Sequence, residues 1–545
     1  MSWRVRDVIW GDILLSEEEK EILDTFEMQR LRGIKQLDFA SLVYPGAEHT
    51  RFQHSLGVRA CIERILKTSN IQIQEENLKL LKVASLIHDV ATPIYSHIVS
   101  DLFRRFYSKI IPPHEKFVNE VLESVCYNKF LDRYPDFYGV DVKPIREVLQ
   151  NQGFSKMDLK KIINIITGTF KPRYISQLVN GPVDADMLDY LRRDAHFTGV
   201  PQGYDDRIFA VYTLNEDYET LTLRERHDTL AAVASVIESR FWMMKKVYLH
   251  PTVLAANCLI IEMLLKALGE YDFYELFYLD DSQIMSKFMN LQNSEVRELA
   301  SRIRYRKLPK RAYVAPLRNL PNYVKQASSG FINYHDLIDK IAEEANKIDP
   351  KNEISREDIY IYLPKDYYKA ADIMVGDFSY EDFDPITIKE LKERYKTLMV
   401  VYIYSSEEKH IEPIYRVCTK TFGVDSEYNP FTKRPFIKRK RRINQELRSF
   451  LDNLREEHNY VIELLYTLAK QNGHNSRDDL AKIMEVNPTT ISTYLQKVYK
   501  AQKNQLKNQV LIRKRFGRKI VWLINPDIRE NLLEEIQKTS INIIK

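Results

Sequence analysis

Apolar residues recur at helical spacing through the first half of the chain, from about Glu17 to Leu268. Two examples are LKLLKVASLIHDV and LKKIINIITGTF. A period near 3.6 residues sustained over such a length predicts packed helices that each bury one apolar face. Alternating stretches, which would predict half-buried strands, are few in this region. We therefore expect a mainly α fold built on a large helical domain.

The composition changes in the second half of the chain. A basic, proline-punctuated stretch occupies about residues 299–324, and beyond it IYIYLPKDYY and TLMVVYIYSS have the β-branched and aromatic makeup of strands. We predict a helical domain over residues 1–305, a small α+β lobe over 306–428 and a basic linker over 429–455.

The last segment, residues 456–545, has the element order of a winged helix-turn-helix. Helices are expected at VIELLYTLAK, SRDDLAKIM and TTISTYLQKVYKAQ, followed by a strand pair in QVLIRKRF and KIVWLIN. In that motif the third helix enters a DNA major groove and the hairpin contacts phosphates. Winged helices also dock protein partners, so both interpretations stay open. The candidate contacts to DNA or RNA are the basic residues of the linker and the hairpin: Lys438, Arg439, Lys440, Arg441, Arg442, Arg513, Lys514, Arg515, Arg518 and Lys519.

The composition excludes several classes of protein. Hydrophobic residues make up 44% of the 545 residues and charged residues 29%, which is typical of an ordered globular protein. No apolar run reaches about 18 residues, and the N-terminal sequence turns acidic before a signal peptide could form, so we expect a cytoplasmic protein with no membrane partner. The four cysteines form no CxxC pair, which predicts buried thiols rather than disulfides. They are Cys61, Cys126, Cys258 and Cys418.

The adjacent pair His88 and Asp89 follows the apolar helix LKVASLI. Such a pair supplies an imidazole and a carboxylate, which suit a divalent cation. The dipeptide alone is common. Two further segments, HTRFQHSLGV at 49–58 and GPVDADMLDYLRRDAHFTGV at 181–200, complete an ordered H…HD…D pattern that is much more specific.

These motifs resemble the HD-domain superfamily. Over roughly residues 5–260 the motifs are similar in sequence to those of its dNTP triphosphohydrolase branch. The similar motifs are QRLRGIKQL, YPGAEHTRFQHSLGV, HDVATPIYSH and DADMLDYLRRD. The resemblance implies an HD-domain helical core, a homo-oligomer, and hydrolysis of dNTPs to deoxynucleoside and triphosphate. It also implies a divalent metal ion, which His and Asp ligands leave open among Mg, Mn, Fe, Ni and Zn. The implied metal ligands are His54, His88, Asp89 and Asp186.

Other matches to the family imply a nucleotide pocket. Arg51 would contact a phosphate, and Leu37 would pack where a ribose 2′-OH would clash. His97 and His114 match histidines that flank the active site and would act as acids or orienting groups. Each assignment has a structural alternative, such as an Arg51 paired with a carboxylate. The full implied set of nucleotide contacts is Gln36, Leu37, Arg51, Tyr190, Asp194, Arg240 and Tyr248.

The chain departs from the family pattern at two informative positions. Thr92 stands where HDxGH has its second histidine, and Met187 replaces the lysine of DxDK. Threonine cannot transfer protons near neutral pH, so the proton relay must differ, while the metal ligands are retained. Two alternatives to dNTP hydrolysis therefore stay open. One is a metal-dependent phosphodiesterase or nuclease, and the other is a nucleotide-sensing DNA-binding regulator with a degenerate site.

Overall fold

The computed structural model describes residues 3–106, 114–135, 142–215, 219–329, 334–350, 353–365 and 373–428, together with parts of 430–532. The chain divides into two compact units, Met1–Ser426 and Glu427–Lys545. The first unit contains the segments that carry the candidate site.

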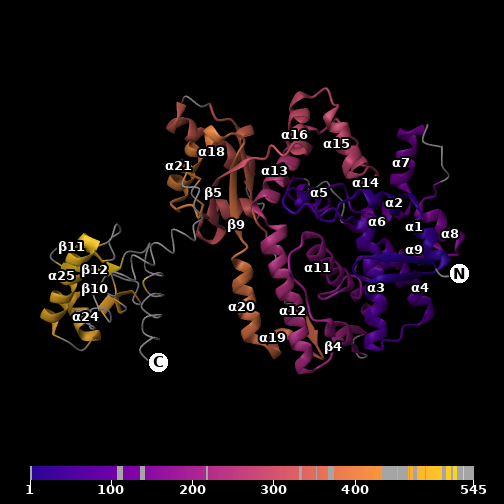
Figure 1. Ribbon diagram of the computed structural model, residues 1–545, viewed down its shortest axis with the longest axis horizontal. Coiled ribbons are helices and arrows are strands. Elements are labelled where there is room, and N and C mark those ends of the chain that lie inside the picture. Colours follow the sequence, from indigo (N-terminus) through magenta and orange to yellow (C-terminus); the bar gives the residue numbers. More distant parts are fainter. Residues whose placement is uncertain are drawn as a thin grey trace. The chain divides into compact units, whose positions relative to one another are not determined.

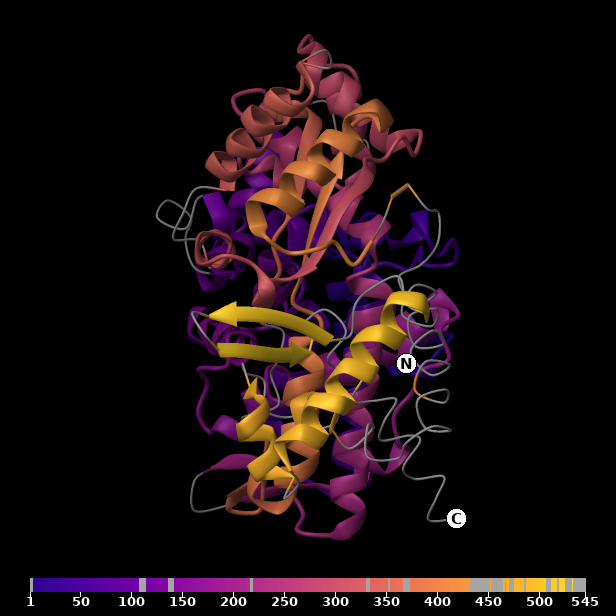
Figure 2. The ribbon, with the colours of Figure 1, turned by 90° about the vertical axis from the view of Figure 1, so that its left-hand side faces the viewer.

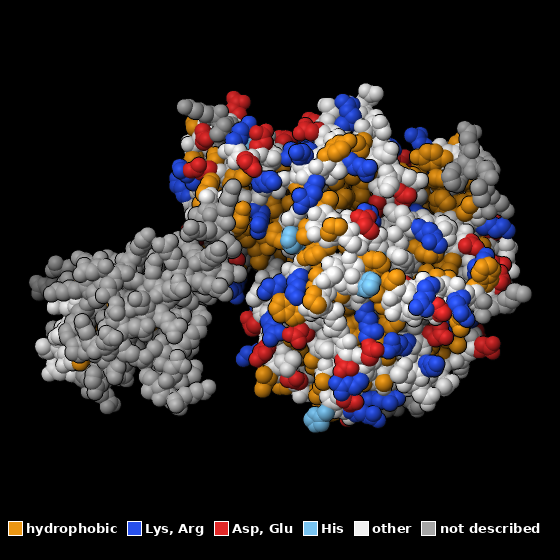
Figure 3. All heavy atoms as spheres, in the orientation of Figure 1, with side chains coloured by type: hydrophobic (Ala, Val, Ile, Leu, Met, Phe, Trp, Pro, Cys, Tyr) orange, Lys and Arg blue, Asp and Glu red, His pale blue; other side chains and the backbone are white. Residues whose placement is uncertain are grey.

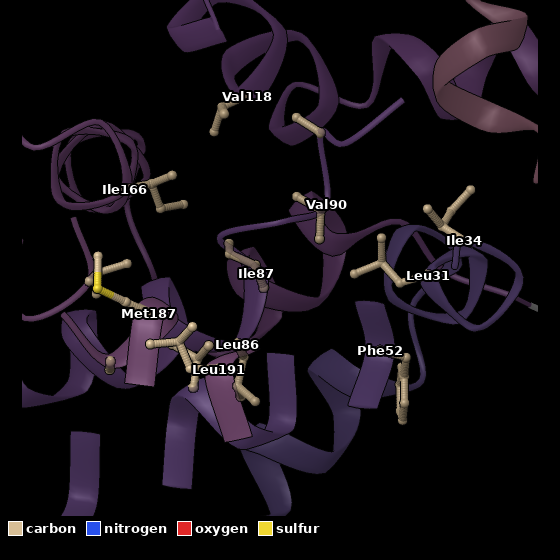
Figure 4. Packing of buried hydrophobic residues seen from close by; sticks show 14 of the residues in the cluster. Leu31, Ile34, Phe52, Leu86, Ile87, Val90, Val118, Ile166, Met187 and Leu191 are labelled. Carbon is tan, nitrogen blue, oxygen red and sulfur yellow. The ribbon is translucent and has the colours of Figure 1, made fainter. Parts of the chain in front are cut away.

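Helices that share one hydrophobic core build most of the first unit, so the predicted mainly α fold is confirmed (Figure 1). Helix α3 lies at the centre of the site region, because α4 and α11 both pack against it. Figure 4 shows part of this packing, with Leu86 and Ile87 of α4 and Leu191 of α11 among the buried side chains. The helices are α1 (Glu17–Leu23), α2 (Phe26–Arg30), α3 (Arg51–Ser69), α4 (Glu75–Ile87), α5 (Ser96–Phe106), α6 (His114–Leu122), α7 (Val125–Arg133), α8 (Ile145–Asn151), α9 (Lys156–Ile166), α10 (Arg173–Gln177), α11 (Ala185–Thr198), α12 (His227–Met243), α13 (Pro251–Lys266), α14 (Glu275–Tyr278), α15 (Asp281–Met289) and α16 (Ser294–Arg304).

A second hydrophobic core forms where the α+β lobe was predicted. Its sheet has the order β5-β9-β6 with antiparallel neighbours, and α18 and α21 cover one face. Figure 2 looks onto these two helices and shows the strands behind them. The elements of this region are β5 (Lys310–Pro316), α17 (Asn322–Ser328), α18 (Tyr334–Ile348), β6 (Ile359–Tyr362), α19 (Tyr380–Phe383), α20 (Pro385–Lys396), β9 (Val400–Ser405) and α21 (Ile411–Phe422).

The lobe and the helical core interlock through strand β9. Val401 and Ile403 belong to the second core, whereas Tyr404 belongs to the first. Alternate side chains of a strand point to opposite faces, so the sheet separates the two cores and packs against both. Helix α20 extends this contact, because it packs along α12. The predicted boundary near residue 305 stays a prediction.

Two short sheets complete the first unit. Strands β1 (Trp3–Asp7) and β2 (Gly11–Leu15) form an antiparallel N-terminal hairpin. The second sheet has the order β3-β4-β7-β8 and joins segments that are far apart in sequence, since β4 pairs in parallel with β7. Its strands are β3 (Tyr212–Asn215), β4 (Thr220–Leu223), β7 (Met374–Val375) and β8 (Phe378–Ser379).

The second unit has its own apolar cluster and the predicted order of helices followed by a strand pair. The three-stranded sheet has the order β10-β12-β11. The winged-helix assignment stays a prediction. Of the helix expected at VIELLYTLAK, residues 464–465 and 467–469 are described and are helical, and the other five fall outside the described residues. Lys438–Arg442 and Arg518 lie outside the described residues, as do the side chains of Arg513, Lys514, Arg515 and Lys519. The described elements are β10 (Asn475–Ser476), α24 (Arg477–Ile483), α25 (Pro488–Gln505), β11 (Leu511–Phe516) and β12 (Lys519–Ile524).

Three global features bear on the expectations from composition. All four cysteines are free and buried, as expected. On the face shown in Figure 3, acidic and basic side chains of the first unit are intermixed. Among the described residues no single helix is long and apolar enough to cross a membrane, and only the bent pair His227–Tyr248 and Pro251–Lys266 reaches that length and apolarity when taken together.

Candidate active site

The four predicted metal ligands come from three helices. His54 lies in the first turn of α3, and Asp186 lies in the first turn of α11. His88 and Asp89 follow the last residue of α4. Because α4 and α11 both pack on α3, the ends of the three helices meet and bring the four side chains together.

Capping interactions fix where the site helices begin. The Gln53 side chain accepts a hydrogen bond of 2.9 Å from the Thr50 N–H, which starts α3. Asp184 accepts a bond of 2.7 Å from the Met187 N–H and is the N-cap of α11. Asp184 is therefore a helix cap, which leaves Asp186 as the carboxylate of this motif that contacts His54.

The distances suit a shared cation. His54 Nε2 lies 2.8 Å from Asp186 Oδ1 and 3.3 Å from His88 Nε2. Asp89 Oδ2 lies 3.9 Å from His54 Nε2 and 3.7 Å from His88 Nε2. His54, His88 and Asp89 offer ligand atoms that all lie within 4.8 Å of one another, whereas Asp186 lies outside this group and would have to shift to share the same ion. Ligand atoms about 2.1 Å from one ion are roughly 3 Å apart.

Hydrogen bonds on the far side of each imidazole orient both histidines. His88 Nδ1 donates to the Ser85 carbonyl at 2.9 Å, and His54 Nδ1 lies 2.8 Å from Asp189 Oδ2. Because each Nδ1 is engaged, the Nε2 atoms of both rings are the ones that face each other. Metal-binding histidines are oriented in this way, and two imidazoles with two carboxylates suit a divalent cation.

A metal cation and a proton compete for the His54 imidazole, so metal binding at this site depends on pH. Burial by itself would lower the pKa of His54, but hydrogen bonds with Asp186 and Asp189 outweigh it and raise that pKa to about 10. Burial also opposes ionisation of Asp89, yet Arg51 and the two histidines hold the pKa of this carboxyl well below its ordinary value. A cation bound at His54 must therefore displace a proton.

Arg51 and Thr92 both contact Asp89. Arg51 Nη1 donates to Asp89 Oδ2 at 2.7 Å, and its Nε donates to Ser96 Oγ at 2.8 Å. Thr92 Oγ1 donates to the other oxygen, Asp89 Oδ1, at 3.1 Å. Arg51 thus makes the carboxylate pair that was its structural alternative, and its contact to phosphate stays a prediction. Thr92 replaces the family's histidine with a group that holds a candidate ligand.

A cavity of about 440 Å³ adjoins Asp186 and gathers most of the predicted nucleotide contacts. Arg51 is not among the residues that line it. His114 begins α6, and its side chain lies outside the described part of the chain. The predicted residues that do line the cavity are Gln36, Leu37, His97, Tyr190, Asp194, Arg240 and Tyr248.

Two contributions to this cavity were not predicted. His49 Nε2 lies 2.8 Å from Asp194 Oδ1, while Tyr248 donates its hydroxyl to Asp194 Oδ2 at 2.5 Å. The lobe adds Tyr362 and Lys365 to the wall. His49 stands at the start of the HTRFQH motif, which was the available signal, whereas the lobe residues carry no motif at all.

A second, wider cavity reaches the candidate ligands from another side. Its volume is about 1070 Å³, and it shares Asp186 and Tyr190 with the smaller cavity. His88 and Asp89 also line it, as does Met187, the residue that replaces the family's lysine. The larger cavity therefore opens onto His88, Asp89 and Asp186, whereas the smaller one reaches Asp186 alone among the candidate ligands.

Comparison with known proteins agrees with this geometry. Residues 51–173 match the HD domain, and residues 207–377 match the HD associated region. The chain belongs to the HD-domain superfamily. The first match includes three of the candidate ligands, and the second includes the β3-β4-β7 sheet and the start of the lobe.

Relatives include proteins of the dNTP triphosphohydrolase branch, as the motifs implied. The deoxynucleoside triphosphate triphosphohydrolase SAMHD1 homolog of Dictyostelium discoideum is 24% identical over 423 residues, which cover 75% of this chain and 74% of that protein. Uncharacterized protein MJ1154 of Methanocaldococcus jannaschii is 30% identical over 302 residues, or 55% of this chain. The match spans only 57% of the length of that relative.

A solved structure shares the fold. The crystal structure of a hypothetical protein from Aquifex aeolicus aligns with a TM-score of 0.57 and 26% sequence identity. The alignment covers 76% of this chain and 100% of the Aquifex chain. The similarity therefore extends over most of the protein.

Proposed function

We propose that this HD-domain protein is a metal-dependent phosphohydrolase that cleaves dNTPs to deoxynucleoside and triphosphate. The observation that carries the proposal is the 440 Å³ cavity, whose wall brings seven predicted active-site side chains to the candidate ligand Asp186. This volume lies within the range of cavities that hold small-molecule ligands, about 300–1,000 Å³. The wall combines apolar residues with a few polar groups, which suits a nucleoside.

The residues have complementary tasks in this proposal. A bound divalent cation would supply Lewis-acid polarisation of a phosphate and a water of lowered pKa. Tyr248 and Asp194, hydrogen-bonded to each other, would contact sugar hydroxyls, and Arg240 would neutralise phosphate charge. His97 lines the same cavity, and an imidazole can donate a proton near neutral pH to the departing 5′-oxygen.

Product analysis tests the proposal. Purified protein is incubated with each dNTP and NTP and Mn²⁺ or Mg²⁺, and the products are separated by chromatography. Asp186→Asn removes a charged ligand, and Asp228→Asn is the matched control, because Asp228 is likewise the second residue of its helix but lines neither cavity. Triphosphate should be released by the wild type and the control and not by Asp186→Asn. No turnover of any nucleotide would overturn the proposal.

A metal-dependent phosphodiesterase or nuclease is the second candidate. The wide 1070 Å³ cavity favours it, because a substrate that continues beyond the scissile phosphate would find room on that side of His88 and Asp89. Shortening of a single-stranded oligonucleotide, lost in Asp186→Asn, would support this activity. Nucleic-acid binding by the second unit, homo-oligomerisation and cytoplasmic location stay predictions.

A further inference from the structure

Asp189 is the centre of a buried hydrogen-bond network behind the candidate metal site. Its Oδ2 atom lies 2.8 Å from His54 Nδ1 and accepts a bond of 2.8 Å from Arg193 Nε. Its Oδ1 atom accepts bonds from Arg193 Nη2 at 2.9 Å and from Trp10 Nε1 at 2.5 Å. The side chain is 0% exposed, so four donors hold it in one orientation.

The N-terminal hairpin supplies a second carboxylate to this network. Asp7 Oδ2 lies 2.8 Å from Arg193 Nη1, and the Arg193 side chain is also 0% exposed. Asp7 and Asp189 thus engage opposite parts of one guanidinium group, an arrangement that fixes its plane. Buried charge of this kind is stable only while each partner is present.

Asp7 also shapes the turn that carries Trp10. Its Oδ1 atom accepts bonds of 2.9 Å from the backbone N–H groups of Ile9 and Trp10. The indole ring packs edge-on against Phe209, with ring centroids 5.7 Å apart. The turn and this contact together direct the indole N–H onto Asp189.

We propose that the hairpin Trp3–Leu15 positions the candidate metal ligand His54. Asp7 and Trp10 act as positioning residues through Asp189, and neither is among the residues lining the two cavities. The partner of the non-coordinating nitrogen sets the orientation and basicity of a metal-binding imidazole, and its loss typically weakens metal binding about 10–100-fold. The inference rests on the metal centre of the proposed function and adds an element that the ligand motifs do not contain.

The test compares two tryptophans on the same hairpin. Trp10→Phe keeps an aromatic ring and removes the N–H that Asp189 accepts. Trp3→Phe is the matched control, since Trp3 also donates its indole N–H to a carboxylate, Glu17, at 2.6 Å but on the surface. Each full-length variant is titrated with Co²⁺, whose visible absorption reports both affinity and ligand geometry.

Trp10→Phe should bind Co²⁺ about 10-fold more weakly, with shifted absorption bands, while Trp3→Phe matches the wild type. A second pair of variants, Asp7→Asn and Asp12→Asn, tests the contact between Asp7 and Arg193. Asp12→Asn is the control, because Asp12 pairs only with exposed arginines in the described structure. Asp7→Asn should weaken Co²⁺ binding and Asp12→Asn should not.

The outcomes separate this inference from the proposed function. Wild-type affinity and spectrum in both Trp10→Phe and Asp7→Asn would overturn the positioning role and leave the metal centre standing. Weaker binding with an unchanged absorption spectrum of the bound Co²⁺ would overturn it too, by assigning the hairpin to stability alone. If the wild-type protein bound no Co²⁺, the proposed metal centre itself would fail.

Discussion

Gly57 lies in α3 against Asp189 and Arg193 of α11. A Cβ atom added there would overlap Asp189 Oδ1 and Arg193 Nη2, so only hydrogen fits between the helix backbone and the buried ion pair. Because Gly57 has no side chain, Asp189 of α11 can reach His54, which lies on α3 with Gly57. A glycine inside a helix normally weakens it, and here the close packing accounts for its presence.

Gly57→Ala should therefore disturb both stability and metal binding. Overpacking of a filled interior lowers the free energy of unfolding by about 1–3 kcal/mol. The displaced Asp189 should also weaken Co²⁺ binding, as measured by the same absorption titration. Gly203→Ala is the control, since nothing lies within 4 Å of a Cβ at that position. Unchanged Co²⁺ affinity in Gly57→Ala would contradict the role given to this contact.

At the scale of single elements, helix α2 contains a buried acid away from the candidate site. Glu27 is 3% exposed, and its Oε2 atom accepts a bond of 2.9 Å from the Ile145 N–H at the start of α8. Burial raises the pKa of Glu27 from 4.5 to about 7. The folded state therefore retains this proton at pH values where the unfolded chain has lost it.

This difference predicts how stability changes with pH. Between about pH 4.5 and 7 the unfolded carboxyl ionises first, so the contribution of Glu27 to stability falls as the pH rises, by on the order of 3 kcal/mol in total. Glu27→Gln cannot ionise and keeps an oxygen for the Ile145 N–H. Relative to wild type, the urea midpoint of this variant should be higher at pH 8 than at pH 5. The exposed Glu75→Gln control should show no such change.

The sequence predicted elements better than the contacts between them. Periodicity placed the helix before His88 and the β-branched strand at 400–405, because both patterns are local. The hairpin at 374–379 was missed, since strands of two residues carry no repeating pattern. Trp10 and Asp189 are 179 residues apart, and one sequence holds no signal that pairs them. A resemblance pointed to the candidate ligands, whereas no motif pointed to the residues that support them.

At the scale of the whole molecule, the three apolar clusters divide unevenly between the two units. The first unit contains two clusters, which the β5-β9-β6 sheet separates. Lobe residues such as Tyr360 and Tyr395 belong to the core of the helical domain. The cluster of the second unit, in contrast, takes its residues entirely from positions 451–532.

Two truncations should consequently behave differently. A chain ending at Ser426 retains both clusters of the first unit and should fold, with wild-type Co²⁺ affinity. A chain ending at residue 305 loses the sheet that covers the helical core and should aggregate or melt at a much lower temperature. Calorimetry and Co²⁺ titration check both. Independent folding of the shorter chain would show that the lobe is not needed by the helical domain.

The hairpin contact also has a consequence for synthesis on the ribosome. Asp7 and Arg193 are 186 positions apart, so Asp7 is translated long before its partner. Asp186, a candidate ligand, emerges only shortly before Arg193. A nascent chain therefore cannot complete the network behind His54 until translation has passed Arg193, so a product that stops before this point lacks the support proposed for this candidate ligand.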